Sequence, residues 1–367
     1  MKYIVLRMMI IFLNFIYFFI KLLPQQNKVV FMSRQSNNIS VDFYLLGNEL
    51  KKRHKVIYLC KTLDKDLKSK ISYGMNIFKQ MYHLSTARVC VLASYIPTVS
   101  ILHHKNNLKI IQIWHAMGVM KEFGCAILDK EEGSNAKISK LMKQHQNYDV
   151  IYCSSDECKE ILARGFGCNK GKLKVMTLPR VDLLMDNEYK ENKKREILKQ
   201  YPQLHEKINI VYCPTFRANE KELEIHINKL AEEINYNKYN LIIKIHPLTK
   251  LSINNKNAIV DNKFSTFEML TIADKIISDY SCIIYEAGIL NIPLYFYNFD
   301  MKNYEIARGI AIKYNELPGY ISTNSKEILE SLEKEYDYKN LERFIKQYVN
   351  NKEKCTEKMV EEIEKNI

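Results

Sequence analysis

Short apolar runs alternate with longer amphipathic segments along most of the chain after Pro24. In the first half, "KVVFMS" at 28–33 and "KVIYLC" at 55–60 have the length and residue types of buried strands. Between them, "SVDFYLLGNELKK" at 40–52 has apolar residues at helical spacing. Because helical segments regularly separate the strand-like runs, the pattern predicts βαβ units and a parallel sheet.

The same alternation returns after a charged stretch in the middle of the chain. Residues 185–207 are rich in Lys and Glu, have helical spacing and lack strand character, and "INIVYC" at 208–213 then resumes the strand pattern. A chain of 367 residues also exceeds one ordinary core. We therefore predict two doubly wound α/β domains. The predicted division is 1–24 for an apolar segment, 25–190 for the first domain, 191–345 for the second, and 346–367 for a charged C-terminal helix.

The N-terminal segment departs from this alternation because it is strongly apolar. Residues 8–20 form an apolar run, which Arg7 and Lys21 bracket and Asn14 interrupts. A full span of a bilayer needs about 20 residues, so this run is short for one. No small-residue cleavage site follows it, which disfavours a signal peptide. We interpret the segment as an uncleaved membrane-attaching helix with the bulk of the chain in the cytoplasm; the alternative is a core helix of the first domain.

Charge and cysteine usage narrow the classes of partner. The formal net charge of +13 suits nucleic acid, anionic lipid or a phosphorylated substrate. Because the chain has no RNA-recognition, zinc-finger or basic-zipper signature, we predict no nucleic-acid partner. The nine Cys form no CxxC pair and several lie in apolar runs, as expected for buried free thiols in a reducing compartment. No His/Cys cluster has metal-ligand spacing, so no metal is predicted.

Polar side chains recur where predicted strands end. His115 follows a strand of the first domain, and three further groups follow strands of the second. Since ligands bind beyond the carboxyl ends of the strands in a doubly wound sheet, the groups of the second domain should converge on one crevice. These three groups are Thr215 with Arg217, His246, and Ser278 with Asp279 and Ser281.

The residue types at the second-domain strand ends suit a nucleotide diphosphate. Arg217 offers a fork of donors to a phosphate oxygen, although an ion pair with a carboxylate is its plainer interpretation. Ser278, Ser281 and the following helix amides offer hydrogen bonds to phosphates, whereas helix capping is the plainer role. Glu286 suits ribose hydroxyls, with helix solvation as the alternative. The predicted donor-binding set is Thr215, Arg217, Ser278, Asp279, Ser281, Cys282 and Glu286.

Two histidines suit acid–base chemistry. His115 lies in the other domain and suits a general base that accepts a proton from an attacking hydroxyl. His246, when protonated, suits neutralisation of charge on the leaving phosphate. Taken alone, a histidine at the end of a strand is more often structural than catalytic, and this applies to both residues. Lys121 follows the His115 loop and is either solvated or a contact of acceptor or phosphate.

Six segments together resemble the CDP-glycerol glycerophosphotransferases of teichoic acid and capsule synthesis. They lie in the order of that family over residues 108–320, which is more specific than any one of them. Two departures concern Ala116, where the family often has Gly, and Val181, where it often has Asn. The segments are "QIWHAMGVMKEFG", "TLPRVDLL", "CPTFR", "KIHPL", "SDYSCIIYEAGILNIPLYFYNFD" and "YEIARGIAIKYNELPGY".

The resemblance implies a GT-B-like fold of two Rossmann-like domains that face a central cleft. It implies transfer of a polyol phosphate from CDP-glycerol or another CDP-polyol to a hydroxyl, with CMP as leaving group and neither metal nor cofactor. The implied base is His115, and the donor phosphates fall to residues 278–281. The implied acceptor is a membrane-linked polyprenyl diphosphate or lipid at the cytoplasmic face of the cell membrane, which the N-terminal segment and the basic charge suit through an anionic surface.

Two other functions stay open on the sequence. A capsular GT-B glycosyltransferase that uses a nucleotide sugar shares a His-Pro pair and a Ser-rich helix start. A non-catalytic basic membrane protein with the same fold would share the charge and the apolar segment. Turnover of CDP-polyols or of nucleotide sugars distinguishes the three.

Overall fold

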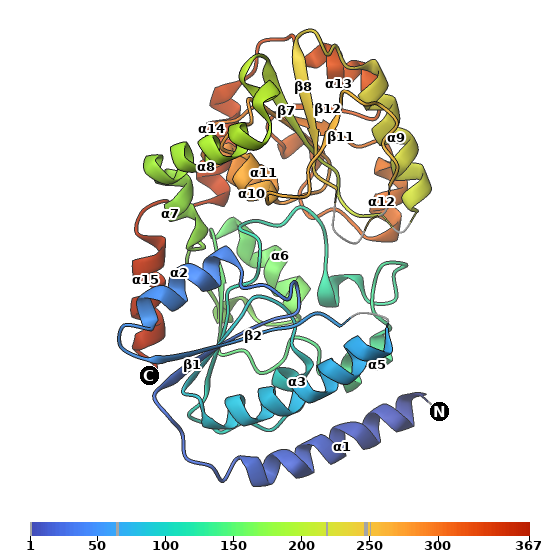
Figure 1. The fold of residues 1–367 in the computed structure, drawn as a ribbon. Coiled ribbons are helices and arrows are strands. Elements are labelled where there is room, and N and C mark those ends of the chain that lie inside the picture. Colours follow the sequence, from blue (N-terminus) through green and yellow to red (C-terminus); the bar gives the residue numbers. More distant parts are fainter. Residues whose placement is uncertain (1, 64–65, 218, 246–248, 250) are drawn as a thin grey trace. The chain divides into compact units, whose positions relative to one another are not determined.

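The computed structural model describes residues 2–63, 66–217, 219–245, 249 and 251–367, and it forms two compact units (Figure 1). The first unit comprises Met1–Met117, Glu122–Asp182 and Asn350–Ile367. The second comprises Gly118–Lys121 and Leu183–Val349. The domain limits predicted from the sequence, 190 and 345, stay predictions. In the structure, the chain passes from the first unit to the second after residue 182, and the last 18 residues belong to the first unit again.

The first unit is built on a six-stranded sheet whose strand pairs are all parallel. The order β2-β1-β3-β4-β5-β6 reverses direction at β1, as in a doubly wound sheet. The side chains of β1 are buried throughout, because helices cover both faces. The strands are β1 (Lys28–Ser33), β2 (Lys55–Cys60), β3 (Val89–Leu92), β4 (Lys109–Gln112), β5 (Val150–Cys153) and β6 (Leu173–Val175).

Some helices of the first unit begin at a polar residue whose side chain caps them. The Ser40 side chain accepts from the Phe43 amide and starts α2. At the C-terminal helix α15, the Asp182 carboxylate accepts from the amides of Cys355 and Thr356 at 2.8 and 2.7 Å, which attaches this helix to the first unit. The helices are α1 (Lys2–Ile20), α2 (Val41–Leu50), α3 (Leu67–Thr86), α4 (Pro97–Ile101), α5 (Ala136–Leu141), α6 (Glu157–Phe166) and α15 (Cys355–Glu364). A further helix, α7 (Arg180–Met185), begins in the first unit and ends in the second.

The second unit is also a six-stranded parallel sheet, in the order β12-β11-β10-β7-β8-β9. The strands are β7 (Ile208–Cys213), β8 (Tyr239–Ile243), β9 (Ile259–Val260), β10 (Lys275–Ser278), β11 (Leu294–Tyr297) and β12 (Tyr320–Ser322). Its helices are α8 (Asn187–Gln200), α9 (Glu220–Glu233), α10 (Thr266–Met269), α11 (Ile283–Ile289), α12 (Met301–Ala307), α13 (Ser325–Ser331) and α14 (Tyr338–Tyr348). The predicted class of two parallel-sheet α/β domains with an N-terminal apolar helix is confirmed.

The switch point of the second sheet explains why its polar groups gather. The order of the strands in the sheet reverses between the parallel strands β7 and β10, and Ser278 at the end of β10 is in register with Cys213 at the end of β7. The loops after these two strands therefore start side by side. The nine cysteines, all described, are free thiols as predicted.

Candidate active site

Asp279 is the centre of the polar group at the switch point of the second unit. Its carboxylate is fully buried and accepts from the Thr215 amide at 3.0 Å and from the Thr215 hydroxyl at 2.6 Å. It also accepts from the Tyr280 amide at 2.6 Å and from Arg217 at 2.8 Å. These bonds fasten the loop after β7 to the loop after β10, so Asp279 orders the site from inside the protein.

Arg217 lies almost wholly within this network, with 5% of its surface exposed. Its Nε donates to Asp300 at 2.6 Å, its Nη2 donates to Asp279, and its Nη1 donates to the Thr215 carbonyl at 2.8 Å. The rings of Tyr280 and Tyr304 stack on each other at 3.8 Å and lie 4.9 and 4.6 Å from the guanidinium carbon. All three guanidinium nitrogens thus have protein partners. These contacts agree with the ion-pair interpretation of Arg217.

The serines of "SDYS" point in different directions. The Ser278 hydroxyl is buried and donates to the Cys213 carbonyl at 3.2 Å. The Ser281 oxygen accepts from the Ile283 amide at 3.4 Å at the start of α11, and both Ser281 and Cys282 are half-buried. Glu286 on α11 is 2% exposed, which excludes simple helix solvation for this carboxyl group. The half-buried Ser281 and Cys282 are therefore the members of this stretch that a ligand can reach.

A short segment from the first half of the chain packs on α11. The carbonyl of Gly118 accepts from the Cys282 thiol at 3.5 Å, and that of Val119 accepts from the Tyr285 hydroxyl at 3.3 Å. The Met120 carbonyl accepts from the Ala311 amide at 3.1 Å, and Lys121 forms a β-bridge with Ile310. This segment brings a lysine to the donor-side group of the second unit.

Lys121 is half-buried in this position and its charge is influenced by its neighbours. Burial and the nearby Arg308 guanidinium lower the pKa of the Lys121 ammonium to about 8, while Asp279 acts in the opposite direction. An ammonium that has lost hydration beside another cation gains from the arrival of an anion. The structure thus shows Lys121 in a setting unlike the solvated one that composition suggested.

His115 follows β4 on a backbone that is held in an uncommon conformation. The preceding Trp114 has φ of 61°, in the left-handed region that bulky residues avoid. The Trp114 amide donates to the Gln112 side chain at 2.9 Å, and its ring packs 4.8 Å from Phe123 and 5.2 Å from Phe166. These contacts stabilise the strained turn and fix the backbone position of His115.

The Nδ1 atom of His115 lies 3.0 Å from the Ala93 carbonyl oxygen and 3.5 Å from the Gln35 amide nitrogen. In the tautomer that donates from Nδ1 to Ala93, the lone pair of the neutral ring is on Nε2. An imidazole oriented in this way is prepared to take a proton through Nε2.

An ion pair that the sequence did not reveal holds the backbone of His115. Arg180 donates through Nη2 to the His115 carbonyl at 3.2 Å. The same guanidinium donates through Nε to Asp42 at 3.0 Å, and the Arg180 amide donates to Asp42 at 2.9 Å. Asp42 is 2% exposed and lies at the start of α2. Arg180 belongs to the "TLPRVDLL" segment, but nothing in the sequence linked it to an aspartate 138 residues earlier.

Comparison with known proteins places this chain in a family. The model of the family described as CDP-Glycerol:Poly(glycerophosphate) glycerophosphotransferase matches residues 15–365. The chain belongs to this family. It is therefore an enzyme of the CDP-glycerol glycerophosphotransferase class, as the six segments predicted.

Two relatives in the glycerophosphotransferase family differ in the polyol that their names give. The teichoic acid ribitol-phosphate primase of Bacillus spizizenii is 27% identical over 343 residues, covering 89% of this chain and 88% of the relative. The teichoic acid glycerol-phosphate primase of Bacillus subtilis is 29% identical over 282 residues, covering 74% and 71%. The solved wall teichoic acid polymerase TagF superposes with a TM-score of 0.74 at 20% identity, covering 93% of this chain and 89% of that chain. This last likeness shows the fold, and with it the predicted GT-B-like architecture is confirmed.

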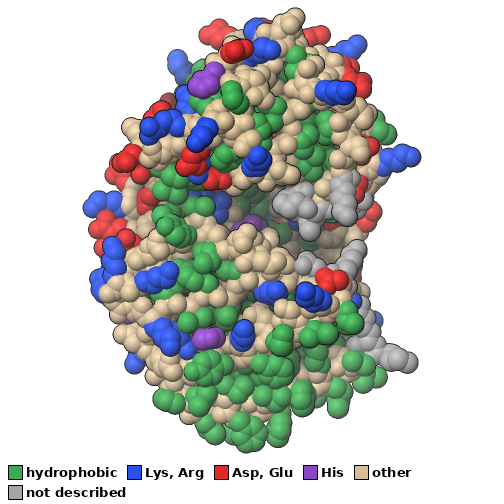
Figure 2. Space-filling model, in the orientation of Figure 1, with side chains coloured by type: hydrophobic (Ala, Val, Ile, Leu, Met, Phe, Trp, Pro, Cys, Tyr) green, Lys and Arg blue, Asp and Glu red, His purple; other side chains and the backbone are tan. Residues whose placement is uncertain are grey.

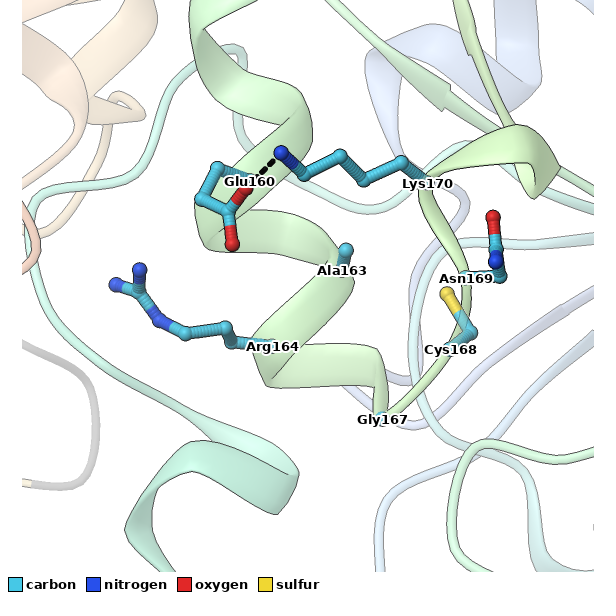
Figure 3. Close-up of a pocket in the computed structure, with 7 residues that line it drawn as sticks. All are labelled: Glu160, Ala163, Arg164, Gly167, Cys168, Asn169 and Lys170. Carbon is cyan, nitrogen blue, oxygen red and sulfur yellow. Dashed lines mark ion pairs between the residues drawn. The ribbon is translucent and has the colours of Figure 1, made fainter.

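Two further predictions from the sequence concern the second histidine, His246, and the absence of a metal. His246 lies outside the described residues. Among the residues that the structure does describe, no group of three or more His, Cys, Asp and Glu side chains is arranged to hold a metal ion. A hollow at the end of α6 contains an ion pair of Glu160 with Lys170 and is lined by none of the predicted site residues (Figure 3).

Proposed function

We propose that this enzyme transfers a polyol phosphate from a CDP-polyol to a hydroxyl of a membrane-linked acceptor in teichoic acid or capsular polymer synthesis. The acceptor oxygen forms a bond to the polyol-bearing phosphorus, the bond from that phosphorus to the bridging oxygen breaks, and CMP leaves. The hydroxyl proton passes to His115 Nε2. The observation that carries the proposal is the placement of this ring. Its Nδ1 faces the Ala93 carbonyl, the turn before it is held by the bond from the Trp114 amide to Gln112, and its own carbonyl accepts from Arg180.

On the donor side, the accessible groups and the buried groups have different roles in this proposal. Ser281, Cys282 and Lys121 contact the diphosphate, because they are half-buried and the lysine gains from an anion. Thr215 and Arg217 act through Asp279, whose position they fix. A direct Arg217 clamp on phosphate would require its bonds to two carboxylates to open. Ser278 and Glu286 support the loop and α11 from inside.

Chain connectivity supports joint action of His115 and the donor group. Gly118, whose carbonyl is bonded to Cys282, follows His115 by three residues. Three peptide units span at most about 11 Å between Cα atoms. His115 is therefore tethered to the segment that carries Lys121. His246 keeps its proposed role as the group that neutralises charge on the leaving phosphate.

The donor and the acceptor are proposed from different observations. The two relatives name ribitol phosphate and glycerol phosphate, so CDP-ribitol and CDP-glycerol are the candidate donors. The described chain contains one helix, near its N-terminus, that is long and apolar enough to cross a membrane. Together with the net charge of +13, this helix supports an acceptor at the cytoplasmic face of the cell membrane.

The test is turnover of purified full-length protein with a lipid-linked acceptor. CDP-glycerol, CDP-ribitol and a set of nucleotide sugars are supplied separately, and release of nucleotide is measured. We expect CMP from at least one CDP-polyol and loss of this release in His115→Ala. His205→Ala, which changes an exposed histidine before β7, at the opposite end of that strand from Thr215, should keep it. Turnover of a nucleotide sugar without turnover of CDP-polyols would overturn the proposal in favour of a glycosyltransferase.

A further inference from the structure

The first sheet has a switch point of its own, close to the strand that leads to His115. The strand order β2-β1-β3-β4 reverses between β1 and β3. Met32 on β1 is in register with Leu92 on β3, and Leu92 is in register with Gln112 on β4. The loops that follow these strands therefore start side by side at one edge of the sheet, where ligands bind in doubly wound folds.

Short contacts join the loop after β1 to the loops after β3 and β4. The Arg34 amide donates to the Ser94 hydroxyl oxygen at 2.9 Å. The side-chain nitrogen of the next residue, Gln35, lies 3.5 Å from His115 Nδ1, and the Ala93 carbonyl oxygen lies 3.0 Å from the same atom. The backbone of Arg34 is thus fixed one residue away from a contact of the proposed base.

The side chain of Arg34 has a different setting from those of Arg180 and Arg217. The guanidinium groups of Arg180 and Arg217 each donate to a buried carboxylate. Arg34 is half-buried, its guanidinium carbon lies 5.4 Å from the centre of the Tyr73 ring, and its Nε is buried without a hydrogen-bond partner among the described residues. Buried donors without a partner are rare in native proteins, and an anion that binds here satisfies this one.

The setting of Arg34 matters more than the net charge of the protein. On the face that Figure 2 shows, Lys and Arg side chains are scattered over both units, so the net charge of +13 does not mark one site there. The Asp42 carboxylate, which lies near the His115 loop, is bonded to Arg180 and compensates that arginine. Arg34 instead combines a place at the switch point with a buried donor that has no described partner.

We propose that Arg34 binds a phosphodiester of the acceptor, next to the hydroxyl from which His115 takes the proton. The acceptor then ends in a polyol phosphate unit, because the terminal hydroxyl of such a unit is only a few carbon atoms from its phosphate. A preceding polyol-phosphate transfer must supply this acceptor, so the enzyme acts at the second or a later addition. The inference rests on the proposed function and names the chemical class of its acceptor.

The first test compares two synthetic lipid acceptors with the full-length parent enzyme. Both end in the same glycerol hydroxyl, but the glycerol is attached through a phosphodiester in one and through a neutral ether in the other. CMP release is measured with each acceptor. A hydrogen bond to a charged group corresponds to a factor of roughly ten to a hundred in affinity, so we expect kcat/KM to be at least about tenfold higher with the phosphodiester acceptor.

Substitution of Arg34 assigns this preference to one residue. Arg34→Gln should raise the KM for the phosphodiester acceptor at least about tenfold with a much smaller change in kcat, and the loss should be several-fold smaller with the ether acceptor. Arg34→Lys keeps the charge but not the fork of donors, so its KM should lie between those of the parent and Arg34→Gln.

Arg88→Gln is the matched control for Arg34→Gln. Arg88 is an exposed arginine directly before β3, at the opposite end of that strand from Ser94, so its substitution should leave the KM for both acceptors unchanged. If Arg34→Gln lost the same factor with both acceptors, Arg34 would have a structural role and the inference would be wrong.

The outcomes separate this inference from the proposed function. If the parent enzyme releases CMP with both acceptors at equal kcat/KM, the transfer is supported and the role of Arg34 is refuted. If it releases no CMP from any CDP-polyol with either acceptor, the transfer is refuted, and this inference with it. The comparison of acceptors needs no variant, so it decides the question even where Arg34→Gln does not fold.

Discussion

Replacing Asp42 with Asn removes the carboxylate that orients Arg180, and through it the His115 loop. The asparagine of Asp42→Asn has the same size as aspartate but no charge. Its amide keeps an acceptor for the Arg180 amide and turns an NH₂ group toward the guanidinium donors Nε and Nη2. A hydrogen bond to a charged group contributes about 1.5–3 kcal/mol. The Arg180 side chain is 17% exposed, so water compensates part of the loss. We expect the free energy of unfolding to fall by about 2–3 kcal/mol, below the cost of breaking a fully buried pair.

The same substitution should lower kcat more than it changes donor binding. The donor-side residues lie in the second unit and keep their contacts, so KM for the CDP-polyol should stay within about twofold, whereas loss of the bond to the His115 carbonyl should lower kcat about tenfold. Urea unfolding and steady-state CMP release measure the two effects. Glu49→Gln, which breaks an exposed pair with Lys52, is the control and should change neither. An Asp42→Asn enzyme with unchanged kcat would refute the positioning role.

Three further predictions concern the second unit. Asp279→Asn should lower the free energy of unfolding by about 3 kcal/mol, because it leaves the buried Arg217 with one carboxylate, and denaturant titration measures this. The pKa of Lys121 is lowered to about 8, so its ammonium is charged only below that pH. We therefore expect kcat/KM for the anionic donor to fall as pH rises through 8. Lys121→Arg keeps its charge, so pH–rate profiles of this variant should not show the fall. Gly118→Ala places a Cβ 2.0 Å from a Tyr285 ring atom and should raise the donor KM about threefold by displacing this segment, with circular dichroism as the check on folding.

Fold class and strand positions follow from the sequence because buried parallel strands leave a strong apolar pattern. "KVVFMS" is β1 and "INIVYC" is β7, and both strands are buried along most of their length. The switch point could also be anticipated, since polar residues directly follow β7 and β10. These features depend on residues close together in the chain.

The roles of individual polar residues could not be read in the same way. Arg217 donates to residues 62 and 83 positions away, and Asp42 accepts from Arg180 across 138 positions. Such pairs form only when the fold brings the side chains together, and neither leaves a pattern in the sequence. The exposed apolar side of α3, with Leu67, Ile71 and Met75, was missed for another reason. Its apolar spacing is that of an ordinary helix, and only exposure shows that this side faces outward.

The central claim is that His115 is the base of a polyol-phosphate transfer, and a single-turnover measurement tests it most directly. Enzyme in excess over CDP-glycerol or CDP-ribitol is mixed with acceptor, and the rate of CMP formation is followed for the parent, His115→Ala and His205→Ala. The account predicts a fall of about 10²–10⁴-fold for His115→Ala with donor affinity retained, and no change for His205→Ala. A His115→Ala enzyme that forms CMP at the parent rate would contradict it.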